Sequence, residues 1–81
     1  MPRPSPKHSQ APLLRAVGIA LRARRKELGI SQEQLALLAS VDRAYVGGVE
    51  RGEHNLTVMT LAQLCTALDI SPGILLKSSE G

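Results

Sequence analysis

Aromatic residues and cysteine are almost absent from this chain. It has no tryptophan and no phenylalanine, and Tyr45 is its single aromatic residue. The apolar residues are mainly Leu, Val, Ile and Ala, which favours packed helices over a β-sheet. With Cys65 alone, no disulfide can form within the chain, and no second cysteine or suitably spaced histidine completes a metal site or a catalytic pair. We therefore predict an all-α domain without metal, cofactor or enzymatic activity, in which Cys65 packs as a small apolar residue.

Long apolar runs are missing as well. No stretch approaches the roughly 18 residues that a transmembrane helix needs, and the N-terminus has no apolar signal region. These absences predict a protein without a membrane partner, located in a cytoplasm where the thiol stays reduced. The 81 residues suffice for one small domain, and burial between two copies would help its modest core.

Acidic residues are absent from residues 1–26, which hold seven of the ten basic residues. These seven are Arg3, Lys7, Arg15, Arg22, Arg24, Arg25 and Lys26. A basic end on a small domain points to a polyanion partner such as nucleic acid, and the alternative is a solvated basic helix face. Four prolines within residues 1–12 predict a disordered arm, followed by the folded domain over residues 13–77 and a frayed tail over residues 78–81.

Helix signals divide the folded domain into five segments. We expect helices over about residues 13–28, 32–39, 43–51, 58–68 and 72–77. Gly29 ends the first helix, and Ser31 with Gln34 forms a capping box at the second, in which Leu35 and Leu38 should face the core. The expected N-caps of the other three helices are Asp42, Thr57 and Ser71.

The segment from Ile30 to Gly52, ISQEQLALLASVDRAYVGGVERG, contains two short helices joined by a tight turn. This layout is typical of a helix-turn-helix, which places its second helix in the major groove of DNA. In that helix Val46 and Val49 form the buried stripe. The residues predicted to approach bases are Arg43, Ala44, Tyr45 and Gly47. Arg43 is the strongest candidate because its guanidinium can donate two hydrogen bonds to O6 and N7 of a guanine.

Two of these positions have a second interpretation. Tyr45 either contacts DNA or is a half-buried ring with a solvated hydroxyl. Gly47 and the neighbouring Gly48 each lower helix stability by roughly 1 kcal/mol relative to alanine. Their presence indicates a close approach of DNA or of a neighbouring helix, unless the helix is merely marginal.

Phosphate contacts position such a domain without reading base sequence. Gln32 is placed for this role at the start of the second helix, where free backbone donors also point outward. The other candidates are Gly48, His54, Asn55 and Thr57. For the last three the alternative is ordinary loop and cap chemistry.

Glu50 lies late in the predicted DNA-reading helix, where an unpaired acid would repel phosphate. We expect it to pair with Arg25 of the first helix in a partly buried salt bridge with a structural role, so that its removal would act mainly through folding.

Three stretches carry a resemblance to a known family: LRARRKELGISQEQLA, VDRAYVGGVERGEHNLTVMTL and LCTALDISPGILL. From about Leu14 to Leu76 the chain resembles the Cro/C1-type (Xre-like) helix-turn-helix regulators, which have a compact five-helix, lambda-repressor-like fold. Its DRAYVGGVERG…NLT run is most similar to the controller proteins of restriction–modification systems. The resemblance implies that Gln32 contacts phosphate and that Arg43, Ala44 and Tyr45 approach bases.

The same resemblance implies the Arg25–Glu50 pair and dimerisation through Ile74, Leu75 and Leu76. The chain departs from the family at Ser40, where glycine is common in the turn, and at Gly47, where controller-like relatives often carry a polar side chain.

These features predict a sequence-specific transcriptional regulator, repressor or activator, that binds a palindromic operator on nucleoid DNA as a homodimer. RNA polymerase is a possible further partner. The alternative is an antitoxin-type interaction module that masks a toxin protein and also binds its own promoter. Fold alone does not separate the two.

Overall fold

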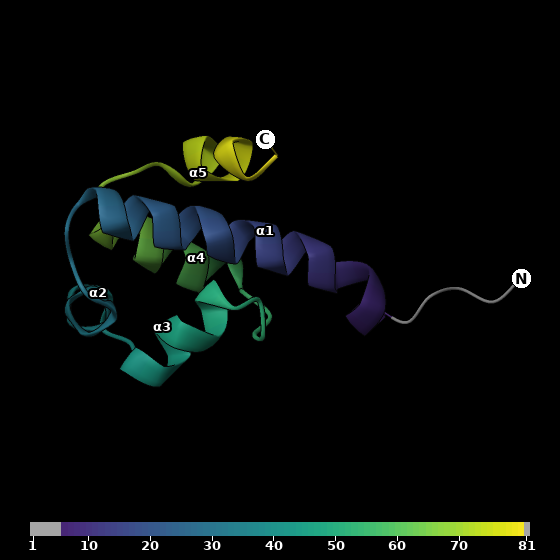
Figure 1. Ribbon diagram of the computed structural model, residues 1–81, viewed down its shortest axis with the longest axis horizontal. Coiled ribbons are helices and arrows are strands. Elements are labelled where there is room, and N and C mark those ends of the chain that lie inside the picture. Colours follow the sequence, from purple (N-terminus) through teal and green to yellow (C-terminus); the bar gives the residue numbers. More distant parts are fainter. Residues whose placement is uncertain (1–5, 81) are drawn as a thin grey trace, which may run out of the picture.

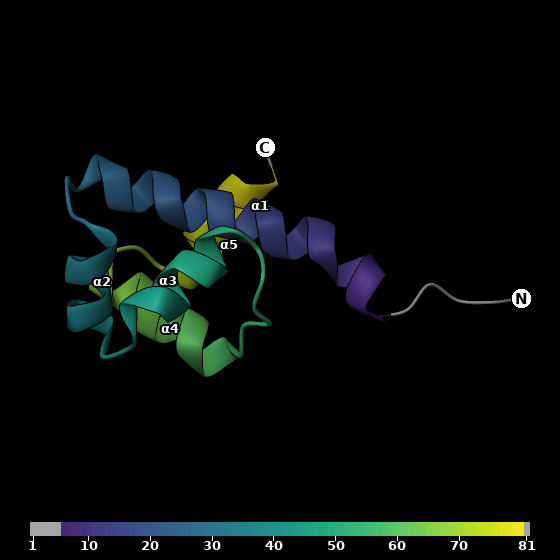
Figure 2. The same ribbon diagram turned by 60° about the horizontal axis from the view of Figure 1, so that its bottom comes forward.

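A computed structural model describes residues 6–80, with side chains from Pro12 onward. Over this range the chain forms five helices, α1 (Pro6–Glu27), α2 (Gln32–Ala39), α3 (Arg43–Glu50), α4 (Val58–Ala67) and α5 (Pro72–Ser79), and no strand. The predicted all-α class and the order of the helices are confirmed. In the view of Figure 1, α1 crosses the molecule with α5 above it and α3 below it. In Figure 2, α3 comes forward in front of α4.

Side-chain caps begin three of the helices where the sequence predicts them. The Ser31 hydroxyl accepts the Gln34 amide at 3.0 Å, and the Gln34 side chain accepts the Ser31 amide at 2.7 Å, which completes the capping box of α2. Thr57 caps α4 and Ser71 caps α5 in the same way. Asp42 occupies the N-cap position of α3, but its side chain makes no capping hydrogen bond.

Left-handed residues follow several of the helices. Gly29 (φ 69°) ends α1, and Gly52 (φ 76°) follows α3. After α2 the same conformation falls on Ser40 (φ 59°), and the Val41 amide donates back to the Ala36 carbonyl at 2.9 Å. The turn therefore closes in the geometry that favours glycine, although the sequence supplies serine there.

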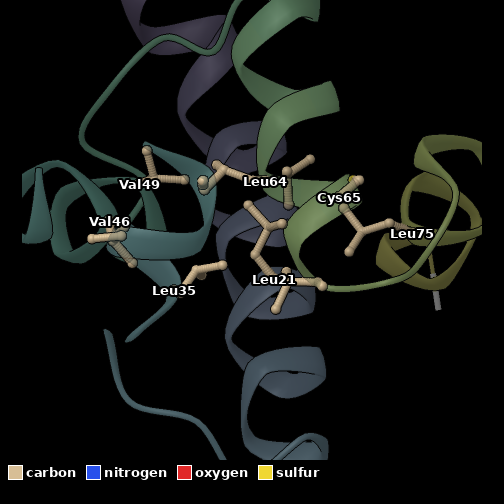
Figure 3. Packing of buried hydrophobic residues seen from close by; sticks show 11 residues of the cluster. Leu21, Leu35, Val46, Val49, Leu64, Cys65 and Leu75 are labelled. Carbon is tan, nitrogen blue, oxygen red and sulfur yellow. The ribbon is translucent and has the colours of Figure 1, made fainter. Parts of the chain in front are cut away.

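The core is built from one side of every helix and is centred on Leu21 of α1. In Figure 3, Val46 and Val49 of α3 lie on one side of Leu21, and Leu75 of α5 lies on the other. The buried apolar residues are Val17, Leu21, Leu35, Ala36, Ala39, Val46, Val49, Leu64, Cys65, Leu68 and Leu75. Leu38 is a correction to the sequence prediction, because it is 62% exposed. The buried face of α2 consists of Leu35, Ala36 and Ala39, and Leu38 lies to one side of it.

The start of α1 is a second correction. The helix begins at Pro6 rather than near residue 13, so the part of the predicted arm within residues 6–12 is helical. Proline is compatible with the first helical position, which needs no amide donor. Pro12 lies inside the helix and is exposed, so water can replace the hydrogen bond that its ring removes. Residues 1–5 of the predicted arm lie outside the described residues. At the other end α5 continues to Ser79, two residues beyond the predicted end.

Arg24 holds the end of α4 against α1. Its Nε donates to the Leu68 carbonyl at 2.9 Å, and its second terminal nitrogen donates to the Asp69 carbonyl at 3.0 Å. A cation at the C-terminus of a helix satisfies carbonyls that have no helical partner and complements the helix dipole. Arg24 belongs to the basic segment that the sequence predicts to face solvent or a polyanion, but in the structure it has this internal role instead.

Within residues 6–80, no single helix is long and apolar enough to cross a membrane. Helices α4 and α5 reach the necessary length and hydropathy only as a pair, with a bend of 98° between them.

Candidate nucleic-acid interface

Helix α3 is exposed at its N-terminal end and buried over residues 46–50. Val46 and Val49 are buried, as predicted, while Arg43 and Ala44 at the N-terminal end are exposed. The α2–α3 turn is short, and α2 packs directly on α3. An exposed N-terminal half on a helix that a second helix braces is the geometry with which a recognition helix reaches base edges.

Glu50 connects α1, α2 and α3 through its carboxylate. Arg25 Nε donates to Glu50 Oε2 at 2.7 Å, and a terminal nitrogen of Arg25 donates to Oε1 at 3.1 Å. The predicted ion pair is therefore present, and both residues are only 8% exposed. The same Arg25 donates to the Ile30 carbonyl at 2.9 Å. Its hydrogen bonds to Glu50 hold the pKa of Arg25 above its ordinary value, despite the opposing effect of burial.

Gln32 joins this network, which the sequence did not reveal. Its side-chain nitrogen donates to Glu50 Oε1 at 3.0 Å. A carboxamide nitrogen carries two N–H donors, so one remains for a further acceptor. The predicted phosphate contact of Gln32 is thus geometrically compatible with its link to Glu50.

The adjacent glycines of α3 are both buried in the protein without DNA, and the close approach of DNA to them stays a prediction. A Cβ at Gly47 would lie 3.1 Å from a terminal nitrogen of Arg51 and 3.7 Å from Gln32 Oε1, so long polar side chains cover this position. A Cβ at Gly48 would lie 2.3 Å from His54 Nε2. Gly48 therefore admits a loop side chain and not a neighbouring helix, and its predicted phosphate contact stays a prediction.

Tyr45 and His54 stack on each other. Their ring centroids are 5.0 Å apart and the ring planes differ by 19°. Tyr45 is half-buried, as one interpretation of the sequence proposed, and His54 is exposed in the loop after α3. The sequence predicts the two residues as separate DNA contacts. Nine positions separate them, and only the return of the loop over Gly48 brings the rings together.

A polar hollow lies where α1, the start of α2 and the end of α3 meet. It is lined by Arg22, Arg25, Lys26, Gln32, Gly47, Glu50 and Arg51. The Arg25 charge is neutralised within the network, whereas Arg22 and Lys26 are exposed. Arg51 makes two hydrogen bonds to Glu53, at 2.9 and 3.2 Å, and these lower the pKa of the Glu53 carboxyl. The rim cations are suited to an anion that approaches from solvent.

The remaining predicted contacts lie elsewhere on the surface. Asn55 and Thr57 are exposed in the loop between α3 and α4, but the Thr57 hydroxyl already caps α4. In α5, Ile74 is 63% exposed and Leu76 is 39% exposed, whereas Leu75 is fully buried against α1 and α4 residues. Leu75 therefore belongs to the core of its own protomer and is corrected as an interface residue.

Comparison with known proteins agrees with this geometry. The family model described as Helix-turn-helix matches residues 21–75. The chain belongs to the helix-turn-helix family. The match includes α2, α3, α4 and part of α1, so it covers the elements that build the candidate interface.

Several helix-turn-helix relatives are controller proteins. The control protein C.SmaI of Serratia marcescens is 42% identical over 66 residues, which span 75% of this chain and 79% of that protein. The restriction–modification controller protein C.AhdI of Aeromonas hydrophila is 50% identical, with a TM-score of 0.75 over 76% of this chain and 94% of that chain.

A third relative is known in a complex with DNA. The controller protein C.Esp1396I, solved as a tetramer in complex with its natural 35 base-pair operator, is 32% identical, with a TM-score of 0.78 over 84% of this chain and 90% of that one. The helix-turn-helix proteins that this chain resembles are regulators and not enzymes. The chain is accordingly a DNA-binding helix-turn-helix regulator similar to restriction–modification controller proteins.

Proposed function

We propose that this protein is a controller-type transcriptional regulator that acts as a homodimer on a two-fold symmetric operator. The observation that carries the proposal is the exposed N-terminal half of α3, with Arg43 at its first position, held by the buried Glu50 network behind it. The similarity to C.AhdI and to operator-bound C.Esp1396I supports the same function.

In this proposal each exposed residue of α3 has its own role in the major groove. Arg43 donates two hydrogen bonds to one guanine, and Ala44 packs against a thymine methyl group. Tyr45 contacts the side of the base step that Arg43 and Ala44 contact. Gly47 lets the helix sit deep once the Arg51 side chain, the group nearest to it, moves toward phosphate, because that side chain is long and flexible.

Phosphate binding falls to groups at the rim of the polar hollow and in the loop after α3. Gln32 offers its second amide proton, and Arg22 and Lys26 offer their charges. Asn55, with His54 and Thr57 beside it, lies in the loop that follows α3 and can contact phosphate as well. Phosphate contacts from both groups of residues would fix the register in which Arg43 reads bases.

The dimer is proposed to form through α5, with Ile74 and Leu76 as its apolar contacts. A hollow between α1 and α5, lined by Leu75 of α5, includes Ile19, which is 65% exposed. Burial of these side chains between two copies would add to a small core. The two α3 helices must then lie about 34 Å apart to reach successive major-groove faces. We place this activity on nucleoid DNA in the cytoplasm.

A second candidate is an interaction module of the antitoxin type. The observation that favours it is a group of exposed apolar side chains on α2 and at the start of α4, namely Leu37, Leu38, Val58 and Met59. Leu38 and Met59 line one hollow. A toxin protein, or RNA polymerase in the controller scheme, would cover such a surface.

The test is selection of bound duplexes from a random DNA pool at moderate salt, together with light scattering of the free protein. We expect a palindrome with half-sites about one helical turn apart and a dimeric mass. Arg43→Ala should flatten the preference at one position of each half-site and leave non-specific binding intact. Recovery of no motif, with weak and steeply salt-dependent binding, would refute operator recognition and favour the interaction module.

A further inference from the structure

We propose that His54 is a positioning residue that sets the orientation of Tyr45 on the DNA-facing side of α3. Gly48 has no side chain and so leaves the space that the His54 ring occupies. The inference rests on the proposed binding of DNA through α3. It assigns His54 a specificity role through its ring, in place of the phosphate contact proposed for it above.

The first observation is the stack itself. Tyr45 lies on the flank of α3, two residues after Arg43, and its ring is half-buried. The surface covering it on the loop side is the His54 ring, with centroids 5.0 Å apart and planes within 19°. Stacking of this kind restrains an aromatic side chain that otherwise rotates about two side-chain bonds. The loop therefore determines where the Tyr45 hydroxyl points.

The second observation is the space beneath His54. A Cβ on Gly48 would lie 2.3 Å from His54 Nε2 and 2.4 Å from Cδ2, so the imidazole occupies the volume that any other residue at this helical position would fill. Glycine inside a helix is unfavourable by roughly 1 kcal/mol relative to alanine. The Glu53 amide also donates to the Gly48 carbonyl at 2.9 Å, which brings the loop back over α3 just before His54.

Together the three residues form a unit that prepares Tyr45 before DNA arrives. A free tyrosine loses rotational freedom when it binds, and that loss opposes binding. When His54 holds the ring in advance, the loss has already occurred on folding. We therefore expect His54→Ala to weaken operator binding by about 2- to 10-fold, with little change on unrelated DNA.

Tyr45 also supplies a direct readout of the stack. Because the chain has no tryptophan, no phenylalanine and no other tyrosine, its near-ultraviolet circular dichroism arises from this one ring. When the Tyr45 ring loses its fixed environment, this circular dichroism signal is lost. This measurement needs no DNA, so it separates failure of the stack from failure of the proposed operator binding.

The experiment compares four full-length variants, His54→Ala, His54→Phe, Gly48→Ala and Gly73→Ala. Each is measured by tyrosine circular dichroism and by titration with the selected operator and with an unrelated duplex. His54→Ala and Gly48→Ala should lose the tyrosine signal and bind the operator more weakly. His54→Phe keeps a stacking ring but no charge or donor. This variant should retain both the tyrosine signal and the operator affinity. Nothing lies within 4 Å of the position that a Cβ at Gly73 would occupy, so Gly73→Ala is the matched glycine control.

The alternative role of His54, a phosphate contact, gives a different pattern. His54→Ala and His54→Phe would then weaken binding to both duplexes equally and leave base preference unchanged. That pattern, or an unaltered tyrosine signal in His54→Ala, overturns the proposal. If Gly48→Ala does not fold, His54→Ala still tests the proposal, because it removes the ring without adding atoms to the helix.

Discussion

At Gly18, α1 packs directly against the backbone at the end of α3, and replacing this glycine with alanine tests the packing of the domain. An added Cβ would lie 2.4 Å from the Val49 carbonyl oxygen, 2.6 Å from the Glu50 carbonyl oxygen and 2.9 Å from the Glu50 carbonyl carbon. All three atoms belong to the backbone, so no side-chain rotation relieves the contact. Ordinary contacts begin near 3.4 Å, and the two helices would have to move apart by about 1 Å.

The magnitude follows from two opposing effects. Overpacking a well-filled contact costs about 1–3 kcal/mol, and we expect the upper part of that range because two backbones must separate. Alanine recovers roughly 1 kcal/mol through its higher helix propensity. The net expectation is a loss of about 2 kcal/mol in the free energy of unfolding, in a domain whose total stability is of order 5–15 kcal/mol.

Urea unfolding followed by far-ultraviolet circular dichroism measures this loss. With a slope of about 1–2 kcal/mol per molar for a small domain, the midpoint should fall by about 1–2 M. Gly73→Ala in α5 is the matched control, because nothing lies within 4 Å of its added Cβ, and it should be neutral or slightly stabilising. A Gly18→Ala midpoint equal to or above that of the unmodified protein would refute the packing argument.

Three other predictions concern buried and strained groups. Glu50→Ala leaves the buried Arg25 charge unpaired and should destabilise the fold by about 3–5 kcal/mol in the same assay. Glu53→Ala removes one partner of an exposed pair and should have a far smaller effect. Equal effects of the two substitutions would contradict the structural role of Glu50. Ser40→Gly should raise the free energy of unfolding by about 0.5–1 kcal/mol because glycine adopts φ 59° without strain, and a destabilised variant would exclude this. Burial raises the pKa of the Cys65 thiol, so a thiol-specific reagent should label it only as fast as the domain opens, and rapid labelling without urea would mean that the core is accessible.

The helix boundaries could be predicted well from the sequence because their signals are local. Ser31 with Gln34, Thr57, and Ser71 before a proline each place a side-chain acceptor within three residues of the amide that it caps. Such contacts depend on neighbours in the chain and not on the fold. The start of α1 is the exception, since proline there is compatible with either an arm or a first helical turn.

The corrected residues all depend on tertiary packing. Leu38 and Leu75 are both leucines on short helices, and their opposite exposures follow from which neighbouring helix lies against each face. Arg24 finds its acceptors 44 and 45 residues away at the end of α4. Periodicity identifies an apolar face to within a residue or two, but it does not show where a third helix crosses it.

Glu50 shows how the fold resolves a conflict at the candidate site. An acid at the end of a helix that faces a polyanion is unfavourable by itself, yet here its carboxylate accepts hydrogen bonds from Arg25 of α1 and Gln32 of α2. The negative charge is neutralised within the protein, and its oxygens hold the first residue of α2 against the last turn of α3. The relative placement of the two helices, and with it the direction of Arg43, then depends on this buried carboxylate. Because Gln32 keeps one donor free, a phosphate bound there would be coupled through Glu50 to α3, the helix proposed to read bases.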